Sequence, residues 1–339
     1  MPKTNEPGAF TPIVEIKNIE DFRDDGNPII FGDRRDGRLY KYTDGTKLAI
    51  NIALATGRPL LILGATGCGK SSMAFNLARV MHRRYYEFVV TSRSQARDLF
   101  YRYDAVRRLG DSQLGRNGNT GLVGTSLTGD LGWQNHFSYI EPGPLWWIFD
   151  KTGARNRGYL DTDNSEQIPR VAKDPVIWPE EPCDASSILL IDEIDKADPD
   201  FPNNLLVPFG SKQFTVEEIA TTITIDSSGK TDDPLQQPLI IITSNQQREL
   251  PDTFLRRCIV LEISSPTPEE LVELAVTTFG IRNDDFYKNI ASGLEKIHGK
   301  ELSAAEFLDA VQAIKKLKAS GSAQSEIIER SSWRSIEPY

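Results

Sequence analysis

A short stretch of the chain has the residue types and spacing of a phosphate-binding loop. Residues 64–71 have the sequence GATGCGKS, which matches G-x-x-x-x-G-K-[ST] at every fixed position. Glycines let the backbone wrap around an anion, so that its N–H groups face phosphate oxygens. Lys70 would reach the β- and γ-phosphates of a nucleotide, and the Ser71 hydroxyl would bind Mg²⁺. The residues predicted to bind the nucleotide are Gly64, Ala65, Thr66, Gly67, Cys68, Gly69, Lys70, Ser71 and Ser72.

A second set of chemical groups follows an apolar run further along the chain. Residues 188–191 are continuously apolar and are followed by Asp192 and Glu193. The pair is typical of a carboxylate that holds Mg²⁺ (Asp192) beside one that polarises the attacking water (Glu193). The alternative, a strand followed by solvated acids, is disfavoured by the separate phosphate loop.

The sequence DKAD at residues 195–198 superficially matches the guanine-binding motif of GTPases. The motif directly follows the strand predicted to hold the metal, so it is too close to reach the guanine base of the nucleotide as well. No D-x-x-G switch motif accompanies it. A Ras-like GTPase is therefore excluded. We expect Asp195 and Asp198 to cap the helix that follows.

A third apolar run, residues 239–243, is followed by Asn245, whose amide is suited to holding a water molecule against a γ-phosphate. A short helical segment then leads to Arg256 and Arg257. Two arginines at a helix end either complement the helix dipole or act as an arginine finger, which neutralises charge on a phosphoryl group in transfer.

These groups need elements that position them. PLLIL before the phosphate loop predicts a short buried strand, and SSMAFNLARVMHRR after it has apolar residues at helical spacing. Continuous apolar runs are typical of strands buried on both faces of a parallel sheet, whose ligands collect at the carboxyl ends of the strands. A strand before and a helix after the glycines disfavour an ordinary glycine-rich turn.

The three motifs together resemble the AAA+ ATPases, and several segments resemble their MoxR branch, which belongs to the clade with a hairpin inserted in the second helix. Those segments are GRPLLILGATGCGKS, EPGPLWWIFD, LLIDEIDKADPDFPNNLLVPFGSKQFTV and SNQQRELPDTFLRRC, within roughly residues 38–316. The resemblance implies an α/β core with a parallel sheet flanked by helices, a small all-helical lid, ATP and Mg²⁺ as ligands, and a ring, usually a hexamer. It also implies that Asn245 is sensor 1 and that the finger is Arg257 or Arg256, with family spacing favouring Arg257.

The resemblance and the local patterns divide the chain. We expect an irregular N-terminal extension (1–37), an ATPase core (38–265) with a hairpin insertion at about 110–142 and a second insertion at about 151–184, a helical lid (266–318) and a flexible tail (319–339). LSAAEFLDAVQAI resembles the lid helix that in this family presents the sensor 2 arginine at its start. Here that start is SAAE at residues 303–306, with only Lys300 nearby.

Two segments leave alternatives open, and the two tryptophans are expected to be structural. Residues 40–46 either border the adenine or belong to the core. Five arginines between Arg93 and Arg108, interleaved with aromatic residues, either contact nucleic acid or form a solvated helix face or ring contact, and the net charge favours the latter. Trp146 and Trp147 are expected to be core and interface anchors rather than ligand groups.

The composition narrows the class of protein. The chain has 339 residues and a net charge of -9, which disfavours a generally basic nucleic-acid binder. Its three cysteines are far apart and its histidines are few, so neither a disulfide framework nor a clustered metal site is expected. We find no signal peptide and no bilayer-spanning run, and expect a cytoplasmic protein.

The sequence favours an ATP-hydrolysing ring that remodels or assembles a partner protein. By resemblance to MoxR-like proteins, the client would include a von Willebrand factor A-domain protein. The alternative is a nucleic-acid-associated motor or defence-system ATPase of the McrB-type clade, supported only by the arginine-rich segment. A non-hydrolysing scaffold is disfavoured because Glu193, Asn245 and the arginine pair are all present.

Overall fold

The computed structural model describes residues 12–16, 40–116, 136–159, 171–179, 186–225, 235–298 and 303–319. Its strands are β1 (Leu60–Leu63), β2 (Arg84–Val89), β3 (Tyr101–Tyr103), β4 (Ile140–Pro142), β5 (Ser187–Asp192), β6 (Gln213–Val216), β7 (Thr221–Thr224), β8 (Leu239–Ser244) and β9 (Ile259–Glu262). Its α-helices are α1 (Asp44–Thr56), α2 (Lys70–Val80), α3 (Arg97–Phe100), α4 (Ala105–Arg116), α5 (Pro144–Phe149), α6 (Lys151–Arg155), α7 (Asp200–Asn204), α8 (Leu206–Ser211), α9 (Asp252–Leu255), α10 (Pro268–Phe279), α11 (Asp284–His298) and α12 (Ala304–Ala319). Three 3₁₀ turns among the described residues are η3 (His136–Tyr139), η4 (Ile194–Lys196) and η5 (Glu217–Ile219).

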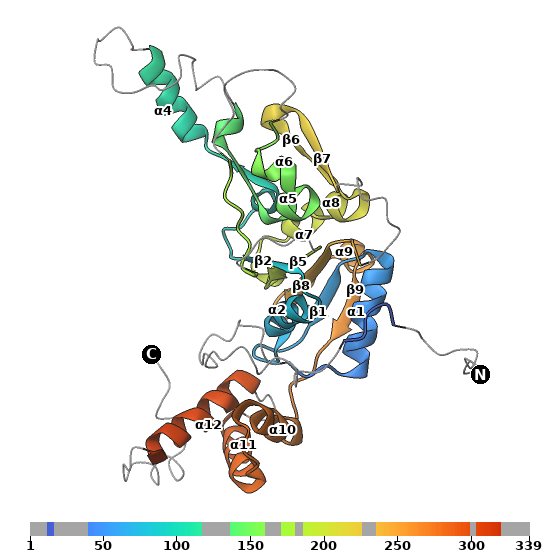
Figure 1. The fold of residues 1–339 in the computed structure, drawn as a ribbon, viewed down its shortest axis with the longest axis vertical. Helices are drawn as coiled ribbons and strands as arrows, with labels where there is room; N and C mark the ends of the chain where they lie inside the picture. Colours follow the sequence, from blue (N-terminus) through green and yellow to red (C-terminus); the bar gives the residue numbers. More distant parts are fainter. Residues whose placement is uncertain are drawn as a thin grey trace, which may run out of the picture.

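A five-stranded parallel sheet forms the centre of the described molecule, in the order β2-β5-β8-β1-β9. All residues of β5 and β8 are buried, as the continuous apolar runs predict. Strand β8 lies between β1, which leads into the phosphate loop, and β5, which carries the acidic pair. The predicted parallel sheet flanked by helices is therefore confirmed (Figure 1).

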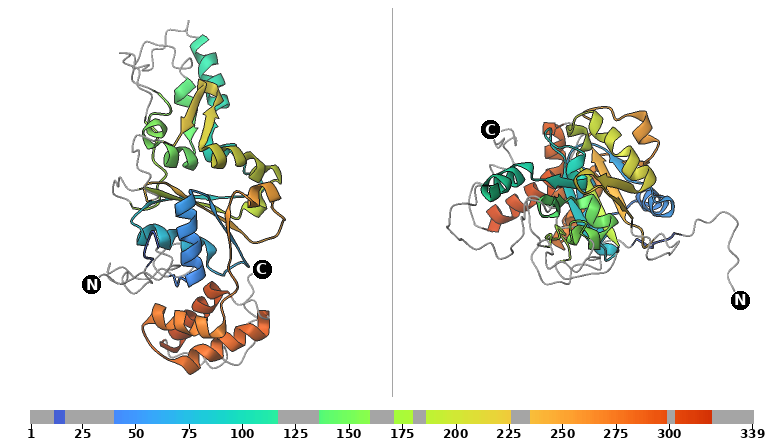
Figure 2. Two further views of the ribbon diagram at one scale, coloured as in Figure 1. Left: turned by 90° about the vertical axis from the view of Figure 1, so that its right-hand side faces the viewer. Right: turned by 90° about the horizontal axis from the view of Figure 1, so that it is seen from above.

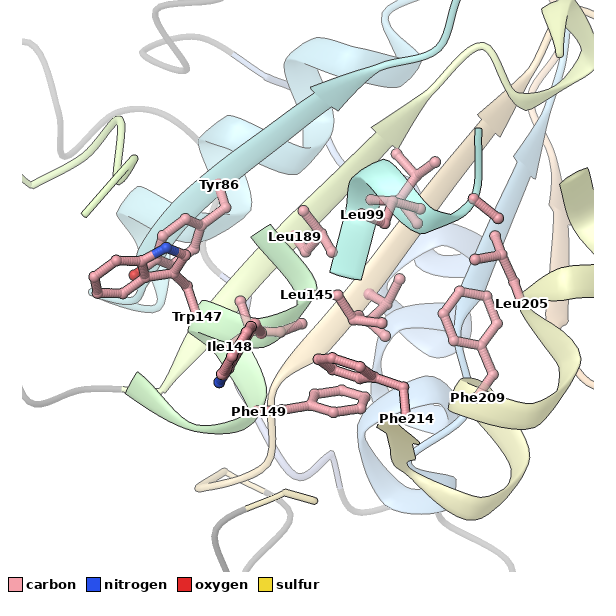
Figure 3. Close-up of a cluster of buried hydrophobic side chains, with 14 of the residues drawn as sticks. Tyr86, Leu99, Leu145, Trp147, Ile148, Phe149, Leu189, Leu205, Phe209 and Phe214 are labelled. Carbon is pink, nitrogen blue, oxygen red and sulfur yellow. The ribbon is translucent and has the colours of Figure 1, made fainter. Parts of the chain in front are cut away.

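Alternate residues of the strands feed two cores on opposite faces of the sheet, because successive side chains of a strand point to opposite faces. Leu60 and Ile62 pack with α1 and α2 in one core, whereas Leu61 packs in the other. The second core includes α5, whose Trp147, Ile148 and Phe149 lie over the sheet in Figure 3. Trp146 and Trp147 are buried there, as expected of core anchors.

The second insertion covers an edge of the sheet. Residues 171–179 run along β2, where Tyr85 N–H donates to Trp178 O (2.7 Å) and Ile177 N–H donates to Tyr85 O (2.8 Å). The Arg79 guanidinium lies 5.5 Å from the centre of the Trp178 ring. These two bonds pair the backbone groups of Tyr85 at the edge of the sheet, where unpaired strand groups can template aggregation.

The first insertion begins on an antiparallel pair of short strands. β3 pairs with β4, with Tyr101 opposite Pro142, and the described residues between them include α4. The described part of the expected hairpin consists of the end of α4, η3 and β4, and residues 117–135 lie outside the description. A different hairpin, β6–β7, follows α8. Figures 1 and 2 show α4 and this hairpin at the end of the molecule opposite α10–α12.

Helices α10, α11 and α12 pack around a core of their own, in which Leu271, Tyr287 and Phe307 are fully buried. A capping box between Thr267 and Glu270 begins α10, and Gly280, with φ 69°, ends it. The helical C-terminal region is therefore present.

Most of the expected N-terminal extension and nearly all of the tail lie outside the described residues. The described residues 12–16 lie against α1, where Val14 N–H donates to Asn51 Oδ1 (2.9 Å). Within the described part of the chain, no helix has both the length and the apolar character to cross a membrane.

Candidate functional site

The phosphate loop connects β1 to α2 through backbone conformations that suit glycine. Gly67 and Gly69 have φ values of 82° and 94°, in the left-handed region that L-residues rarely adopt. A Cβ on Gly69 would lie 3.3 Å from the Tyr40 ring, and one on Gly67 would lie 2.2 Å from Ser303 Oγ. The glycines of the motif are thus required both by the turn and by the close neighbours of the loop.

The Lys70 ammonium lies inside the loop. Its Nζ donates to Gly64 O (2.7 Å) and Ala65 O (2.6 Å), and the side chain is buried. Lys70 is the first residue of α2, so its charge lies where loop N–H groups and the helix N-terminus are also positive. This concentration of positive charge suits a polyphosphate.

A chain of hydrogen bonds joins the phosphate loop to β5 and β8. Ser71 Oγ donates to Asp192 Oδ1 (2.7 Å), and so does Thr243 Oγ1 (2.5 Å). Glu193 N–H in turn donates to Thr243 Oγ1 (2.8 Å). Residues that the sequence separates by more than a hundred positions therefore meet at the carboxyl edge of the sheet.

The donor set at this edge suits Mg²⁺. Magnesium prefers oxygen ligands, keeps several waters and is held by one or two protein groups together with substrate phosphates. The hydroxyl of Ser71 and the carboxylate of Asp192 are such groups and lie in direct contact. The two predicted metal ligands thus lie where one cation could bind both, beside the phosphate loop.

Glu193 is held in one position by its backbone and by both carboxylate oxygens. Its φ of 61° is a left-handed conformation. Asn245 Nδ2 donates to Oε1 (3.1 Å), and Lys196 Nζ donates to Oε2 (2.6 Å). The predicted base and the predicted sensor amide are thus in contact.

The expectation that Asp195 caps the following helix is wrong. The Asp195 carboxylate is buried and accepts from the backbone N–H groups of Asn245 and Gln247, both at 3.1 Å. It fixes the loop after β8 because strand order brings that loop against η4. Asp198 does lie at a helix start, where its Oδ1 accepts from Asp200 N–H (3.0 Å).

The two arginines lie apart from these groups. Arg256 and Arg257 are exposed at the end of α9, and Arg257 donates to Thr253 O (3.1 Å). In the described part of the chain, neither guanidinium contacts the phosphate loop or the acidic pair. The structure does not bring this predicted pair into the site of the same chain.

The start of α12 meets the phosphate loop. Ala304 N–H donates to Gly67 O (3.2 Å), and Ser303 Oγ accepts from Glu306 N–H (3.3 Å). This is the position where the resembled family has its sensor 2 arginine, and Lys300 lies outside the described residues. Lys41, just before α1, also forms an ion pair with Glu273 of α10.

Both aromatic residues of residues 40–46 pack in or against the core formed with α1 and α2. Tyr42 belongs to the core, with its hydroxyl donating to Asn76 Oδ1 (2.8 Å). Tyr40 packs at Gly69, and burial, with a smaller contribution from Cys68, raises its pKa well above that of an exposed tyrosine. Tyr40 is therefore the member of this segment that borders the loop.

The arginine-rich segment is not one basic helix. It spans α3, β3 and the start of α4, and its charges have local partners. Arg97 pairs with Glu218, and Arg102 pairs with Asp98 (3.1 Å). Arg107 lies 4.0 Å from Asp111, and Arg108 lies 3.0 Å from His136 Nε2. Three of the five arginines thus lie beside carboxylates, whereas Arg108 lies beside a histidine.

Three residues of the site are absent from the sequence-based prediction: Thr243, Lys196 and Ser303. Thr243 is a polar residue at the end of the predicted apolar run, which is a weak but readable signal. Lys196 and Ser303 have no such sequence signal, because their roles depend on where η4 and α12 lie relative to the phosphate loop.

The fold and the site define a P-loop nucleotide-binding domain in which an extra strand, β8, separates the phosphate-loop strand from the acidic strand. The model of the AAA domain (dynein-related subfamily) matches residues 59–258, so the chain belongs to this family. This match does not distinguish the MoxR branch from other members of the family. No curated protein sequence matches the chain.

Solved structures of a bacterial motor are similar to the chain in outline. A mutant of Thermotoga maritima RuvB is 12% identical, with a TM-score of 0.45, over 86% of this chain and 68% of that one. The T. maritima RuvB Holliday junction branch migration motor is 10% identical, with a TM-score of 0.40, over 85% and 66%. The chain therefore spans about two thirds of these structures. At these TM-scores, the similarity supports no conclusion beyond the topology described above.

Proposed function

We propose that the chain hydrolyses ATP with Mg²⁺ at the site between the phosphate loop, β5 and β8. The observation that carries the proposal is the contact of Ser71 with Asp192, beside a Glu193 carboxylate that is bonded to Asn245. Family membership adds support, since the matched residues include every one of these groups.

Each residue has a role in this proposal. Lys70 and the loop N–H groups bind the β- and γ-phosphates, and Ser71 and Asp192 hold the cation. Mg²⁺, when bound, neutralises charge on the phosphates. Glu193 accepts a proton from the attacking water, and the Asn245 amide orients that water.

The test is Glu193→Gln. The amide cannot accept a proton, so turnover of Mg²⁺·ATP should fall by about 10²-fold or more while ATP affinity changes little. Phosphate release measures turnover, and titration with a fluorescent ATP analogue measures affinity. Turnover equal to that of the unchanged chain would remove Glu193 from the role of base.

The finer proposal is a MoxR-like hexameric ring, in which Arg257 or Arg256 acts on the ATP of the neighbouring subunit. Both arginines are exposed at the end of α9, and in the described residues neither forms an ion pair. An exposed guanidinium that forms no ion pair is available to a second copy of the chain.

The proposed client is a protein, with a von Willebrand factor A-domain protein as the first candidate, because the resemblance is to MoxR-like ATPases. The Glu193→Gln variant provides the test, since a chain that binds ATP without hydrolysing it should retain its client. Affinity purification with Mg²⁺·ATP, compared with purification of Lys70→Ala, should identify a protein retained only by the first variant.

The nucleic-acid alternative has weaker support. Its only basis is the arginine-rich segment, where Arg97, Arg102 and Arg107 all lie beside carboxylates. Binding of single-stranded or duplex DNA at 0.15 M salt, lost on Arg102→Ala, would favour this alternative over the protein client.

A further inference from the structure

We propose that Asp195 is a positioning residue for hydrolysis, whose carboxylate fixes the loop after β8 so that the Asn245 amide meets Glu193. The inference rests on the proposed function, in which the Asn245 amide orients the attacking water. Asp195 acts through Asn245 and is not a catalytic residue, because its two oxygens are bonded to backbone N–H groups of that loop.

The carboxylate holds the loop through both of its oxygens. Asn245 N–H donates to Asp195 Oδ1 and Gln247 N–H donates to Oδ2, both at 3.1 Å. Between them, Gln246 has a left-handed φ of 58°, and its N–H donates to Ser244 Oγ (3.0 Å). A left-handed residue in a turn can aim neighbouring N–H groups at a common anion. The Asp195 carboxylate is the anion that this turn binds.

Asp195 can hold the loop firmly because it is buried. The residue is only 3% exposed, and hydrogen bonds to an ionised acceptor shielded from water are strong. Arg248 adds a second bond between the loop and the end of η4, donating to Ala197 O (2.9 Å). Loss of the carboxylate would leave two N–H groups without their acceptor, so we expect the loop to shift until they are satisfied.

The same short segment also carries the proposed base. Glu193 directly precedes η4, and its N–H donates to Thr243 Oγ1 in β8 (2.8 Å). Its Oε1 accepts from Asn245 Nδ2 (3.1 Å). The base and the carboxylate that positions the amide therefore belong to one segment. A misplacement of about 1 Å can lower the rate of an enzyme by about 10²-fold, so the position of the loop should affect turnover.

The activity test is Asp195→Asn, which keeps the shape of the side chain. The new amide nitrogen cannot accept from an N–H group, so one of the two bonds to the loop is lost. We expect kcat for ATP to fall by about tenfold or more with little change in KM, because the phosphate loop is untouched. Asp198→Asn is the matched control. Its exposed carboxylate accepts from Asp200 N–H at a helix start, and kcat should stay within about twofold.

A double-mutant cycle separates positioning from support of the fold. In an Asn245→Ala background, Asp195→Asn should cause no further fall in kcat, because the amide that it positions is already absent. An equal fall in kcat in both backgrounds would mean that Asp195 only supports the fold, and would overturn the proposal. All rates are compared below the melting temperature of each variant.

Arg248→Met tests the same attachment from an exposed position, where a substitution leaves the core intact. It should lower kcat by about two- to fivefold, again only when Asn245 is present. If Asp195→Asn does not fold, this variant decides, and an unchanged kcat would overturn the proposal.

Failure of the proposed function would give a different result. Normal turnover by Asn245→Ala would remove the amide from hydrolysis, whatever Asp195 does. Normal turnover by Asp195→Asn beside an impaired Asn245→Ala would overturn the positioning role alone.

Discussion

Thr243 is the residue on which the acidic part of the site depends most directly. Its hydroxyl donates to Asp192 Oδ1 and accepts from Glu193 N–H, and the side chain is fully buried. A buried hydroxyl that satisfies two partners is costly to remove, because each partner has already lost its water.

We expect Thr243→Val to lower the free energy of unfolding by about 1–3 kcal/mol. Valine has the same shape, so the loss comes from the hydrogen bonds rather than from a cavity. Urea denaturation measures the change. Thr224→Val, at an exposed position on β7, is the control and should stay within about 0.5 kcal/mol. Equal effects at the two positions would argue against the bridging role.

The two described cysteines differ in burial, and this difference leads to a second prediction at the residue scale. Burial raises the pKa of the Cys258 thiol to about 12, an effect that the nearby Arg58 guanidinium only partly offsets. At pH 8 its thiolate fraction is then about 10⁻⁴, and the thiol is also shielded from reagents. Cys68, in contrast, lies half-buried in the phosphate loop.

We therefore expect iodoacetamide at pH 8 to modify Cys68 and not Cys258 in the folded chain. Mg²⁺·ATP should protect Cys68, because nucleotide covers the loop. Peptide mass spectrometry distinguishes the sites, and the same reaction in urea should modify both. Modification of Cys68 at the same rate with and without nucleotide would contradict binding at this loop.

At the scale of elements, the contact between α12 and the phosphate loop links the lid to the nucleotide site. Ala304 N–H donates to Gly67 O, so the helix begins directly against the loop. Any side chain on Gly67 would occupy the space of Ser303. The position of α12 is thus sensitive to the shape of the loop.

We expect Gly67→Ala to weaken ATP binding by about tenfold or more, because the φ of 82° costs about 1–2 kcal/mol for an L-residue and the new Cβ meets Ser303. Adding Ser303→Gly should relieve the steric part alone and restore some of the affinity. Gly45→Ala, where a Cβ would make only an ordinary contact with Thr43 Oγ1 (3.9 Å), is the control. Titration with a fluorescent ATP analogue measures all three.

At the scale of the whole molecule, the proposed ring places the site between two chains. The phosphate loop, acids and amide converge, but Arg256 and Arg257 lie exposed at the end of α9, away from them. A ring would supply the missing guanidinium from the next subunit, and arginine fingers contribute roughly 10³–10⁵ in kcat in other phosphoryl-transfer systems.

We expect Arg257→Ala to nearly abolish turnover with little change in ATP affinity, because in the proposed ring its guanidinium serves a different chain. A mixture of Arg257→Ala and Lys70→Ala chains, each inactive alone, should recover part of the activity, since some intact loops would face intact fingers. Sedimentation should show co-assembly. No recovery in co-assembled rings, with the same result for Arg256→Ala, would leave the pair as a structural feature.

The sequence by itself determined the groups that face phosphate and the elements that carry them. The glycine-rich motif, the three apolar runs and the lid helices are local patterns, and each is set by neighbours a few positions away. Their locations in β1, β5, β8 and α10–α12 agree with the structure. The polar ends of the strands could be placed at one edge because parallel strands share that edge.

Only the tertiary structure decided which of those groups touch. The bond from Asp195 to the loop after β8, the bridge through Thr243 and the contact of Ser303 with Gly67 all join segments that lie far apart in the chain. So does the cover that residues 171–179 form on β2. Such contacts follow from strand order and lid position, which arise from the packing of the whole core and leave no periodic trace in the sequence.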